Sequence, residues 1–266
     1  MKSKSGYKIS PLSFNRKAVA ASASVTREKN TIHGFTEIDI TIPRRLMREY
    51  FERTGEKLSF TSYIVFCLAQ TMKEYPQFNS FISGNKFILL DDVTISVLVE
   101  REIEGEKVPE PIGIQKAQRK SFLEIQNEIR GAKKVTSDKL GSISGMEWFR
   151  FIPNFLLKTF VRIADRNIAM GIRYGKVAVT AVGMFSEEAV WLIPHGSATV
   201  LVSVGSISQK VIETDGEFVS REHLCMTVSF DHDIVDGAPA ARFINDFVKT
   251  IKSGELLQKE LNSNLA

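Results

Sequence analysis

The sequence predicts an α+β fold, in which helices cover a mixed, largely antiparallel sheet. Apolar residues recur at helical spacing in some long stretches and alternate at strand spacing in others. Two strand-like stretches flank Asp215-Gly216, a dipeptide typical of a tight hairpin turn. The order of these elements is mixed and the paired strands come late, which favours the α+β class.

Outside residues 146–176, four helices are predicted from apolar periodicity and from boundary signals. The first begins at Pro43 and ends at Gly55, and the second follows Ser59, a suitable cap, and stops before Pro76. The second is apolar around much of its circumference, so we expect it to be buried. The third, at 120–134, places Phe122, Ile125 and Ile129 on one side, and the fourth, at 239–252, carries one apolar stripe.

Strands are predicted between these helices and in the C-terminal half. Residues 86–92 and 93–100 read as two strands around a short acidic turn. Further strands are expected at 35–40, 176–185 and 197–208, followed by the hairpin over 211–230. In its second arm, Leu224, Met226, Val228 and Phe230 alternate with His223, Cys225, Thr227 and Ser229.

Composition and organisation narrow the class of protein. The 266 residues contain no repeat or low-complexity linker, so we expect a single domain over 1–266. The net charge of +4 comes from interspersed acidic and basic residues, which gives no reason to expect a nucleic-acid partner. No secretory signal or spanning segment is visible, and Cys67 and Cys225 lie in apolar segments. We therefore predict a cytoplasmic protein.

His232 lies with three carboxylates where the last strand turns into the last helix, in SFDHDIVDGAPAARF (229–243). Asp236 is a good helix N-cap, and His232 can be an ordinary hydrogen-bonded residue. A histidine at a strand end beside carboxylates also suits a general base, because imidazole titrates near neutral pH. With four histidines and no spaced ligand cluster, we expect no metal site, and the Gly-x-Ser-x-Gly pattern of serine hydrolases is absent.

These residues resemble a known family. His232-Asp-Ile-Val-Asp236-Gly237 is similar to the H-x-x-x-D-G motif of the catalytic domain of 2-oxoacid dehydrogenase dihydrolipoamide acyltransferases and of chloramphenicol acetyltransferase. The flanks resemble the family pattern D-H-x-x-V-D-G-A followed by A-A-R-F, and VTAVGMF at 179–185 resembles its I-S-N-L-G-M-F stretch. Residues 30–41 and 75–80 also fall where the family patterns place them, and the resemblance runs from about Arg16 to Phe247.

The resemblance implies a two-layer sandwich of helices on a mixed sheet, assembled as a homotrimer or a larger trimer-based assembly with active sites between subunits. It implies a CoA-dependent acyltransferase that moves an acyl group between CoA and a thiol, hydroxyl or amine acceptor. We expect no lipoyl attachment within this chain, so the acceptor is a small molecule or a lipoyl group on another protein. Two other functions stay open: a catalytically inactive trimeric scaffold or binding protein, and an acyl-CoA hydrolase.

The resemblance also implies roles for two residues of the reaction itself. His232 matches the general base, which takes a proton from the attacking thiol or hydroxyl. Thr180 stands where the family places a serine whose hydroxyl donates to the tetrahedral oxyanion, and a threonine can supply this donor. Ala181 replaces the asparagine that usually follows, so this part of the site departs from the family pattern.

Three further residues are implied as supports of the site. Asp236 matches the carboxylate of the motif, which in chloramphenicol acetyltransferase pairs with an arginine near the N-terminus. Arg16 is the candidate for that arginine, and Gly237 completes the motif. Asp233 departs from the arginine common in the dehydrogenase acyltransferases, so a surface that such an arginine helps to form is not expected here.

Residues 146–176 depart from the family, whose link into the VTAVGMF strand is shorter and more polar. After Pro153 the pattern predicts a helix with Leu156, Phe160 and Ile163 on one side and basic residues at four-residue spacing on another. This segment can cover the channel as part of the acceptor site, pack in the core or at a subunit interface, or rest on an anionic membrane surface. We favour core or interface packing over a membrane role.

Overall fold

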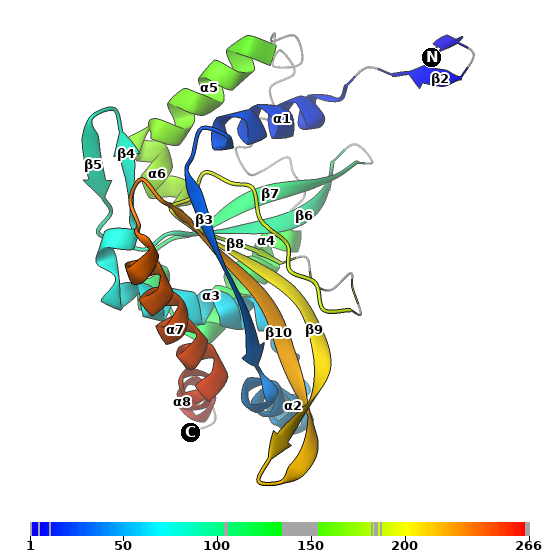
Figure 1. Cartoon of the computed structure of the whole chain (residues 1–266), viewed down its shortest axis with the longest axis vertical. Helices are drawn as coiled ribbons and strands as arrows, with labels where there is room; N and C mark the ends of the chain where they lie inside the picture. The colour runs from blue at the N-terminus through cyan, green and yellow to red at the C-terminus, as the bar shows by residue number, and fades with distance from the viewer. Residues whose placement is uncertain are drawn as a thin grey trace.

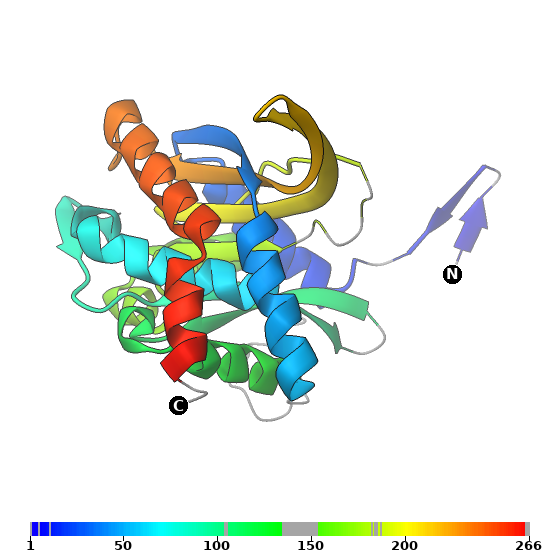
Figure 2. The same cartoon turned by 90° about the horizontal axis from the view of Figure 1, so that it is seen from below.

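The computed structural model describes residues 2–4, 6–10, 12–103, 106–134, 154–181, 183, 186 and 188–263. Within them, one face of a six-stranded sheet is covered by a layer of helices (Figures 1 and 2). This layer consists of α2 (Thr41–Thr54), α3 (Phe60–Thr71), α4 (Phe122–Lys134), α7 (Gly237–Ser253) and α8 (Glu255–Ser263), with the short 3-10 helices η1 (Met72–Glu74), η2 (Pro76–Phe78) and η3 (Ala117–Arg119). The α+β sandwich predicted from the sequence is confirmed.

The sheet has the strand order β3-β10-β9-β8-β6-β7. Its strands are β3 (Thr31–Asp39), β6 (Ile95–Ile103), β7 (Glu106–Ile114), β8 (Val177–Ala181), β9 (Val200–Thr214) and β10 (Glu217–Asp231). The pairs β3–β10, β10–β9 and β6–β7 are antiparallel, whereas β9–β8 and β8–β6 are parallel. The sheet is therefore mixed, as predicted. Its edges are β3 and β7, and β7 contains Pro109 and Pro111.

The hairpin of β9 and β10 turns at the predicted dipeptide. Asp215 (φ 53°) and Gly216 (φ 81°) both adopt the left-handed conformation that a tight hairpin turn requires. The alternation in β10 is also confirmed, since Leu224, Met226, Val228 and Phe230 belong to the core against the helices. The alternate residues Cys225, Thr227 and Ser229 are buried as well, because the extended segment 188–198 runs across the opposite face of the sheet (Figure 1).

The predicted helices are confirmed with small differences at their ends, since α2 begins at Thr41 instead of Pro43, and α3 ends at Thr71, after which η1 continues to Glu74. Gly55 ends α2 with φ 72°, and the hydroxyl of Ser59 accepts a hydrogen bond from the backbone N–H of Ser62 at the start of α3. Nearly all of α3 is buried, and α4 buries Phe122, Ile125 and Ile129. The stripe of α7 packs into an aromatic cluster, in which Phe243 contacts rings that include Tyr75, Phe78, Phe230 and Phe247.

The two strands predicted over 86–100 are confirmed as β5 (Lys86–Leu89) and β6, but they do not pair with each other across the acidic turn. Instead, β5 pairs with β4 (Ser80–Ser83) in a separate two-stranded sheet, and β6 pairs with β7 and β8. The reason is Asn79, whose side-chain amide donates to the carbonyls of Leu90 and Asp92 (2.8 and 3.1 Å). These bonds hold the acidic turn against η2, so the chain leaves β5 without folding back on it.

The remaining elements lie outside the helical layer. The hairpin of β1 (Lys2–Lys4) and β2 (Tyr7–Ile9) projects away from the body, and α1 (Phe14–Thr26) lies alongside α5 (Asn154–Arg166) (Figure 1). The short helix α6 (Ile168–Tyr174) leads into β8. Among the described residues, no helix combines the length and apolar character needed to cross a membrane.

The helix predicted after Pro153 is confirmed as α5. Packing in the core, one of the two alternatives favoured for its apolar side, is wrong for three residues, whereas packing at a subunit interface stays a prediction. Leu156, Phe160 and Ile163 are exposed in this chain, whereas Leu157 is buried. The inward side of α5 is the one that carries Leu157 and Asp165, so the apolar side predicted to pack faces outward. Residues 146–153 of the predicted segment lie outside the described residues.

A buried ion pair attaches α5 to the sheet. The ammonium of Lys176, next to β8, lies 2.7 Å from a carboxylate oxygen of Asp165 and also donates to the Asp165 carbonyl (2.6 Å). The Ser197 hydroxyl donates to the same carboxylate (2.6 Å), and Lys176 lies over the ring of Phe81. Burial alone would raise the pKa of Asp165, but attraction to Lys176 and the hydrogen bonds from Lys176 and Ser197 together hold this pKa below its ordinary value.

We expect Asp165→Asn to destabilise the fold by about 3–5 kcal/mol at neutral pH, because it leaves a buried ammonium without its carboxylate. In the parent, the contribution of this carboxylate is complete above its ordinary pKa of 3.8 and is lost as pH falls through the lower folded-state pKa. Measured by unfolding in denaturant between pH 7 and pH 3, the free energy of unfolding should therefore fall less steeply with decreasing pH in the variant than in the parent.

The matched control is Glu49→Gln, which removes the exposed carboxylate paired with Arg45 on α2. Its stability should change by less than about 0.5 kcal/mol. If both variants lost the same stability, the ion pair of Asp165 and Lys176 would have no special role in holding α5.

Candidate active site

His232 is the first residue of the turn between β10 and α7. The strand ends at Asp231, whose N–H donates to Thr199 O (3.0 Å), and the N–H of His232 donates to Asn30 O (2.6 Å). The carbonyl of Asp231 then accepts from Ile234 and Val235, which closes the turn. These backbone bonds fix the position of the histidine, while its side chain stays 43% exposed and accessible to a substrate.

The two ring nitrogens of His232 have different surroundings. Nδ1 lies 3.7 Å from Oδ1 of Asp236, which is too long for a hydrogen bond but close enough for attraction once the ring is protonated. Asp236 takes the N-cap position of α7 with an extended backbone, yet its side chain makes no capping hydrogen bond. In the part of the chain that the structure describes, Nε2 has no hydrogen-bond partner, so this nitrogen is available to a substrate.

A buried carboxylate stands directly before His232. The side chain of Asp231 is 2% exposed, and Lys29 Nζ lies 2.6 Å from its Oδ2. Its Oδ1 accepts from the N–H of Asp233 (3.2 Å), and the amide of Asn30 donates to the Asp233 carboxylate (2.8 Å). Residues 29–30 therefore hold the turn through side chains as well as backbone, a role for which the sequence of this loop carries no signal.

The structure does not pair Arg16 with Asp236. Arg16 is exposed in the first turn of α1, which lies alongside α5 and away from the start of α7 (Figure 1). The predicted ion pair is therefore wrong for a single chain, since Arg16 and Asp236, both described, form none. At this turn the carboxylate paired with a basic side chain is Asp231. Gly237 begins α7 in an open position, where a Cβ would meet no atom within 4 Å.

Thr180 lies in β8, half-buried, on the face of the sheet opposite the helical layer. It pairs with Ser203 of β9, which in turn pairs with Thr227 of β10, so three hydroxyl side chains form a row across the sheet. Among the residues that the structure describes, the buried hydroxyls of Ser203 and Thr227 have no hydrogen-bond partner. Ala181, at the end of β8, packs partly against the core.

One chain does not bring Thr180 and His232 together. The register places Thr180 beside Ser203 of β9. Thr199, which directly precedes β9 and lies four residues before Ser203, accepts the hydrogen bond from Asp231, the neighbour of His232. The two residues are thus about 13 Å apart along the strands and about 10 Å apart across them. An oxyanion donor and a general base must both touch one reacting group, so these two positions in the same chain cannot serve one site.

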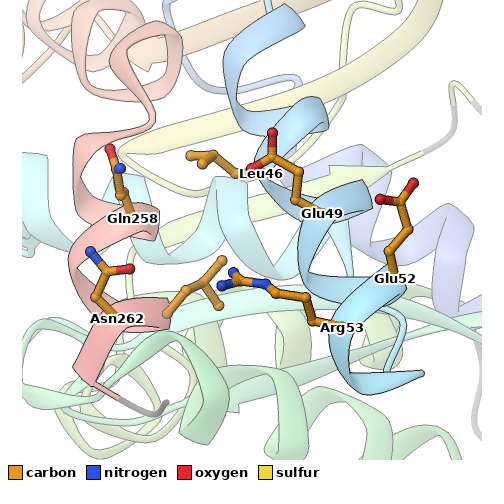
Figure 3. Close-up of a pocket in the computed structure, with 7 residues that line it drawn as sticks. Leu46, Glu49, Glu52, Arg53, Gln258 and Asn262 are labelled. Atoms are coloured by element: carbon orange, nitrogen blue, oxygen red, sulfur yellow. The ribbon is translucent and has the colours of Figure 1, made fainter. Parts of the chain in front are cut away.

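A cavity of about 420 Å³ lies elsewhere, between α2 and α8. It is lined by Leu46, Glu49, Glu52, Arg53, Gln258, Leu261 and Asn262, and Arg53 points from α2 toward α8 (Figure 3). Helix α7 runs from the turn of His232 toward α8 and is about 25 Å long. The cavity therefore lies at the opposite end of the helical layer and contains none of the predicted site residues.

Comparison with known proteins identifies the family. The sequence model for the 2-oxoacid dehydrogenases acyltransferase (catalytic domain) matches residues 4–146 and 169–258. The chain is 28% identical over 260 residues to the lipoamide acyltransferase component of the branched-chain alpha-keto acid dehydrogenase complex of Bacillus subtilis (strain 168), covering 94% of this chain and 54% of that protein. It is also 28% identical over 254 residues to the dihydrolipoyllysine-residue succinyltransferase component of the 2-oxoglutarate dehydrogenase complex of Staphylococcus saprophyticus, covering 92% and 53%. The chain spans about half the length of the curated relatives it matches.

Solved structures show the same fold. A probable dihydrolipoamide acetyltransferase of Listeria monocytogenes 4b F2365 superposes with a TM-score of 0.68 at 23% identity, covering 94% of this chain and 96% of that chain. A chloramphenicol acetyltransferase superposes with a TM-score of 0.51 at 14% identity, covering 90% and 94%. Both likenesses agree with the mixed sheet and its helical layer. By its sequence over most of its length, the chain belongs to the 2-oxoacid dehydrogenase acyltransferase family, in the part that forms the catalytic domain.

Proposed function

We propose that this chain is a CoA-dependent acyltransferase in which His232 is the general base. The observation that carries the proposal is the half-exposed imidazole of His232, fixed by backbone bonds at the end of β10 with Nε2 available. This imidazole belongs to the motif that resembles the family's catalytic motif, in a chain that belongs to the family. The acyl group passes between CoA, which is a substrate here, and a thiol, hydroxyl or amine acceptor.

In the proposed reaction, Nε2 takes the proton of the acceptor thiol or hydroxyl as that atom attacks the thioester carbonyl of acyl-CoA. Asp236, beside Nδ1, stabilises the imidazolium that forms. When the tetrahedral intermediate collapses, the bond to the CoA sulfur breaks and the imidazolium returns its proton to that sulfur. The products are the acylated acceptor and free CoA, and no acyl-enzyme is needed.

The oxyanion donor comes from a neighbouring subunit in this proposal. Within one chain Thr180 and His232 are too far apart, so a trimer is needed to place the Thr180 hydroxyl of one copy beside the His232 of the next. In the dihydrolipoamide acetyltransferase of Azotobacter vinelandii, a serine, a histidine and an asparagine were investigated for roles in catalysis. That serine precedes the histidine by 52 residues and the asparagine follows it by four, the spacings of Thr180, His232 and Asp236 here, which supports the assignment.

The relatives suggest the class of acceptor. The curated relatives act on dihydrolipoyllysine residues or are lipoamide acyltransferases, and one structural neighbour is the cubic core of a pyruvate dehydrogenase complex. We infer that a dihydrolipoyl group on another protein is the leading acceptor for this chain, with a small molecule as the alternative. Cys67 and Cys225 are both free and buried, and these unpaired thiols support the proposed assignment to a reducing, cytoplasmic compartment.

We expect His232→Ala to lower the rate of acyl transfer by about 10²- to 10⁴-fold, because it removes the proton acceptor without touching the buried turn. The measurement is release of free CoA thiol from a panel of acyl-CoAs, with and without dihydrolipoamide or amine and alcohol acceptors. The control is His223→Ala, a half-buried histidine of the same strand at a distance from the turn, which should keep the parent rate.

The outcomes separate the competing functions. Acceptor-dependent release that disappears in His232→Ala supports acyl transfer, whereas release that needs no acceptor indicates an acyl-CoA hydrolase. Equal release by the parent and by His232→Ala would exclude His232 as the base. No release from any acyl-CoA, with a trimeric native mass, would favour the inactive scaffold.

We also expect Thr180→Ala to lower kcat by about 10²-fold, because an oxyanion donor acts mainly in the transition state. A mixed assembly of Thr180→Ala and His232→Ala chains, refolded together at equal amounts, tests whether the site is shared. If each site takes Thr180 from one copy and His232 from another, about a quarter of the sites are intact and activity returns. Mixtures that stay as inactive as the two single variants would contradict a site shared between subunits.

A further inference from the structure

Helices α5 and α6 expose a cluster of large apolar side chains. These are Phe155, Leu156, Phe160 and Ile163 on α5, and Ile168 and Ile172 on α6. Single exposed apolar residues are ordinary, but here six lie on two consecutive helices. Leu157, also on α5, is buried, so this helix has an apolar residue on its inward side in addition to its outward apolar side.

The same two helices carry an excess of positive charge on their surface. Lys158, Arg162, Arg166 and Arg173 are exposed, and Arg162 also forms an ion pair with Glu28 in the loop after α1. The one acidic residue in the sequence of α5 and α6 is Asp165, and its carboxylate is held inward by Lys176. The outward surface of α5 and α6 therefore combines apolar and cationic side chains with no carboxylate of its own.

The orientation of this surface is fixed by the contacts on its inner side. The Asp165 carboxylate is bound by Lys176 and Ser197, and the Ser83 hydroxyl donates to the carbonyl of Arg166 (2.7 Å). Residues 147–168, which include all of α5, fall outside the match to the family model. Ile172 of α6 lies inside the match, so the exposed cluster joins a helix outside the match, α5, to a part that the shared catalytic domain includes.

We propose that α5 and α6 form a docking surface for a membrane that contains anionic lipids. On α5, Leu156 and Ile163 lie along one side of the outward surface and Lys158 and Arg166 along the other, over a helix about 20 Å long. A bilayer interface offers acyl chains and phosphate groups in adjacent layers. A helix that lies parallel to the membrane can therefore place its apolar side against the acyl chains and its basic side against the phosphates. An acidic protein partner would match the charges but would need an apolar patch of the same outline, whereas a fluid interface needs no matched shape.

The position of the surface relates it to the proposed catalytic turn. Asp165 and Lys176 are close enough to Lys29 and Asp231 for each ion pair to influence the charges of the other. Asp231 directly precedes His232, so docking through α5 and α6 brings this end of the molecule toward the lipid. The docking proposal goes beyond the proposed acyl transfer and does not depend on it.

The test is co-sedimentation of the full chain with vesicles of phosphatidylcholine, with and without phosphatidylglycerol. We expect binding to the anionic vesicles that weakens at high salt, and little binding to the neutral ones. Lys158→Gln and Arg166→Gln should each lower the partition coefficient by about fivefold. The double variant Leu156→Ser with Ile163→Ser should lower it by at least about tenfold.

Matched controls lie at the other end of the molecule. Val211→Ser with Phe218→Ser removes two apolar side chains, both more exposed than those on α5, from the hairpin of β9 and β10, and Arg45→Gln with Arg53→Gln removes two bases from α2. Neither should change vesicle binding, and thermal unfolding should show that every variant keeps the parent fold.

The docking proposal is overturned if the parent binds neither kind of vesicle, or if the controls reduce binding as much as the α5 variants. If the parent does not bind vesicles and the double variant Leu156→Ser with Ile163→Ser has a lower native mass than the parent, the surface is instead assigned to contacts between copies of the chain. Acyl transfer is measured in solution without lipid, so failure of the docking proposal and failure of the proposed function are distinguishable.

Discussion

The burial of the Asp231 carboxylate is the constraint on which the candidate site depends. A carboxylate removed from water must have a charged or hydrogen-bonding partner, and Lys29 supplies it from the loop that follows α1. The same loop accepts the backbone N–H of His232 through Asn30. The end of β10 therefore cannot move without separating a buried ion pair. The backbone of His232 is held in the same way, although its imidazole is half-exposed.

The two faces of the central strands serve different purposes. The face toward the helices is apolar and packs aromatic and branched side chains, and their burial stabilises the sandwich. The other face carries Thr180, Ser203 and Thr227 in one row, and the buried hydroxyls of Ser203 and Thr227 have no partner within the described part of the chain. Burial of a hydroxyl without a partner costs about 1–3 kcal/mol. Packing alone does not favour such a row. Because the row includes Thr180, the proposed oxyanion donor, it is consistent with a face maintained for chemistry.

Much of the fold could be predicted because its elements carry local signals. Gly55, Ser59 and the Asp215-Gly216 turn mark boundaries through their own backbone preferences, and α4 and α7 show their buried faces by spacing. The failures concern partners distant in sequence. Nothing near residues 86–100 indicates that Asn79 turns the chain away, and the pairing of Lys29 with Asp231 spans 202 residues. The position of His232 at the strand end follows from a local motif, whereas the pairing of Arg16 with Asp236 rests on analogy with distant relatives, and one chain does not form it.

The two edges of the sheet differ in their risk of aggregation. Pro109 and Pro111 have no backbone N–H, so a foreign strand cannot form a continuous ladder along β7. No proline occurs in β3, the opposite edge, and Trp191 donates its indole N–H to the carbonyl of Thr36 in that strand. A substitution that released residues 188–198 from β3 would thus expose an edge strand to which a strand of another copy could add, as in amyloid. The protein would then lose solubility before its helical layer unfolded.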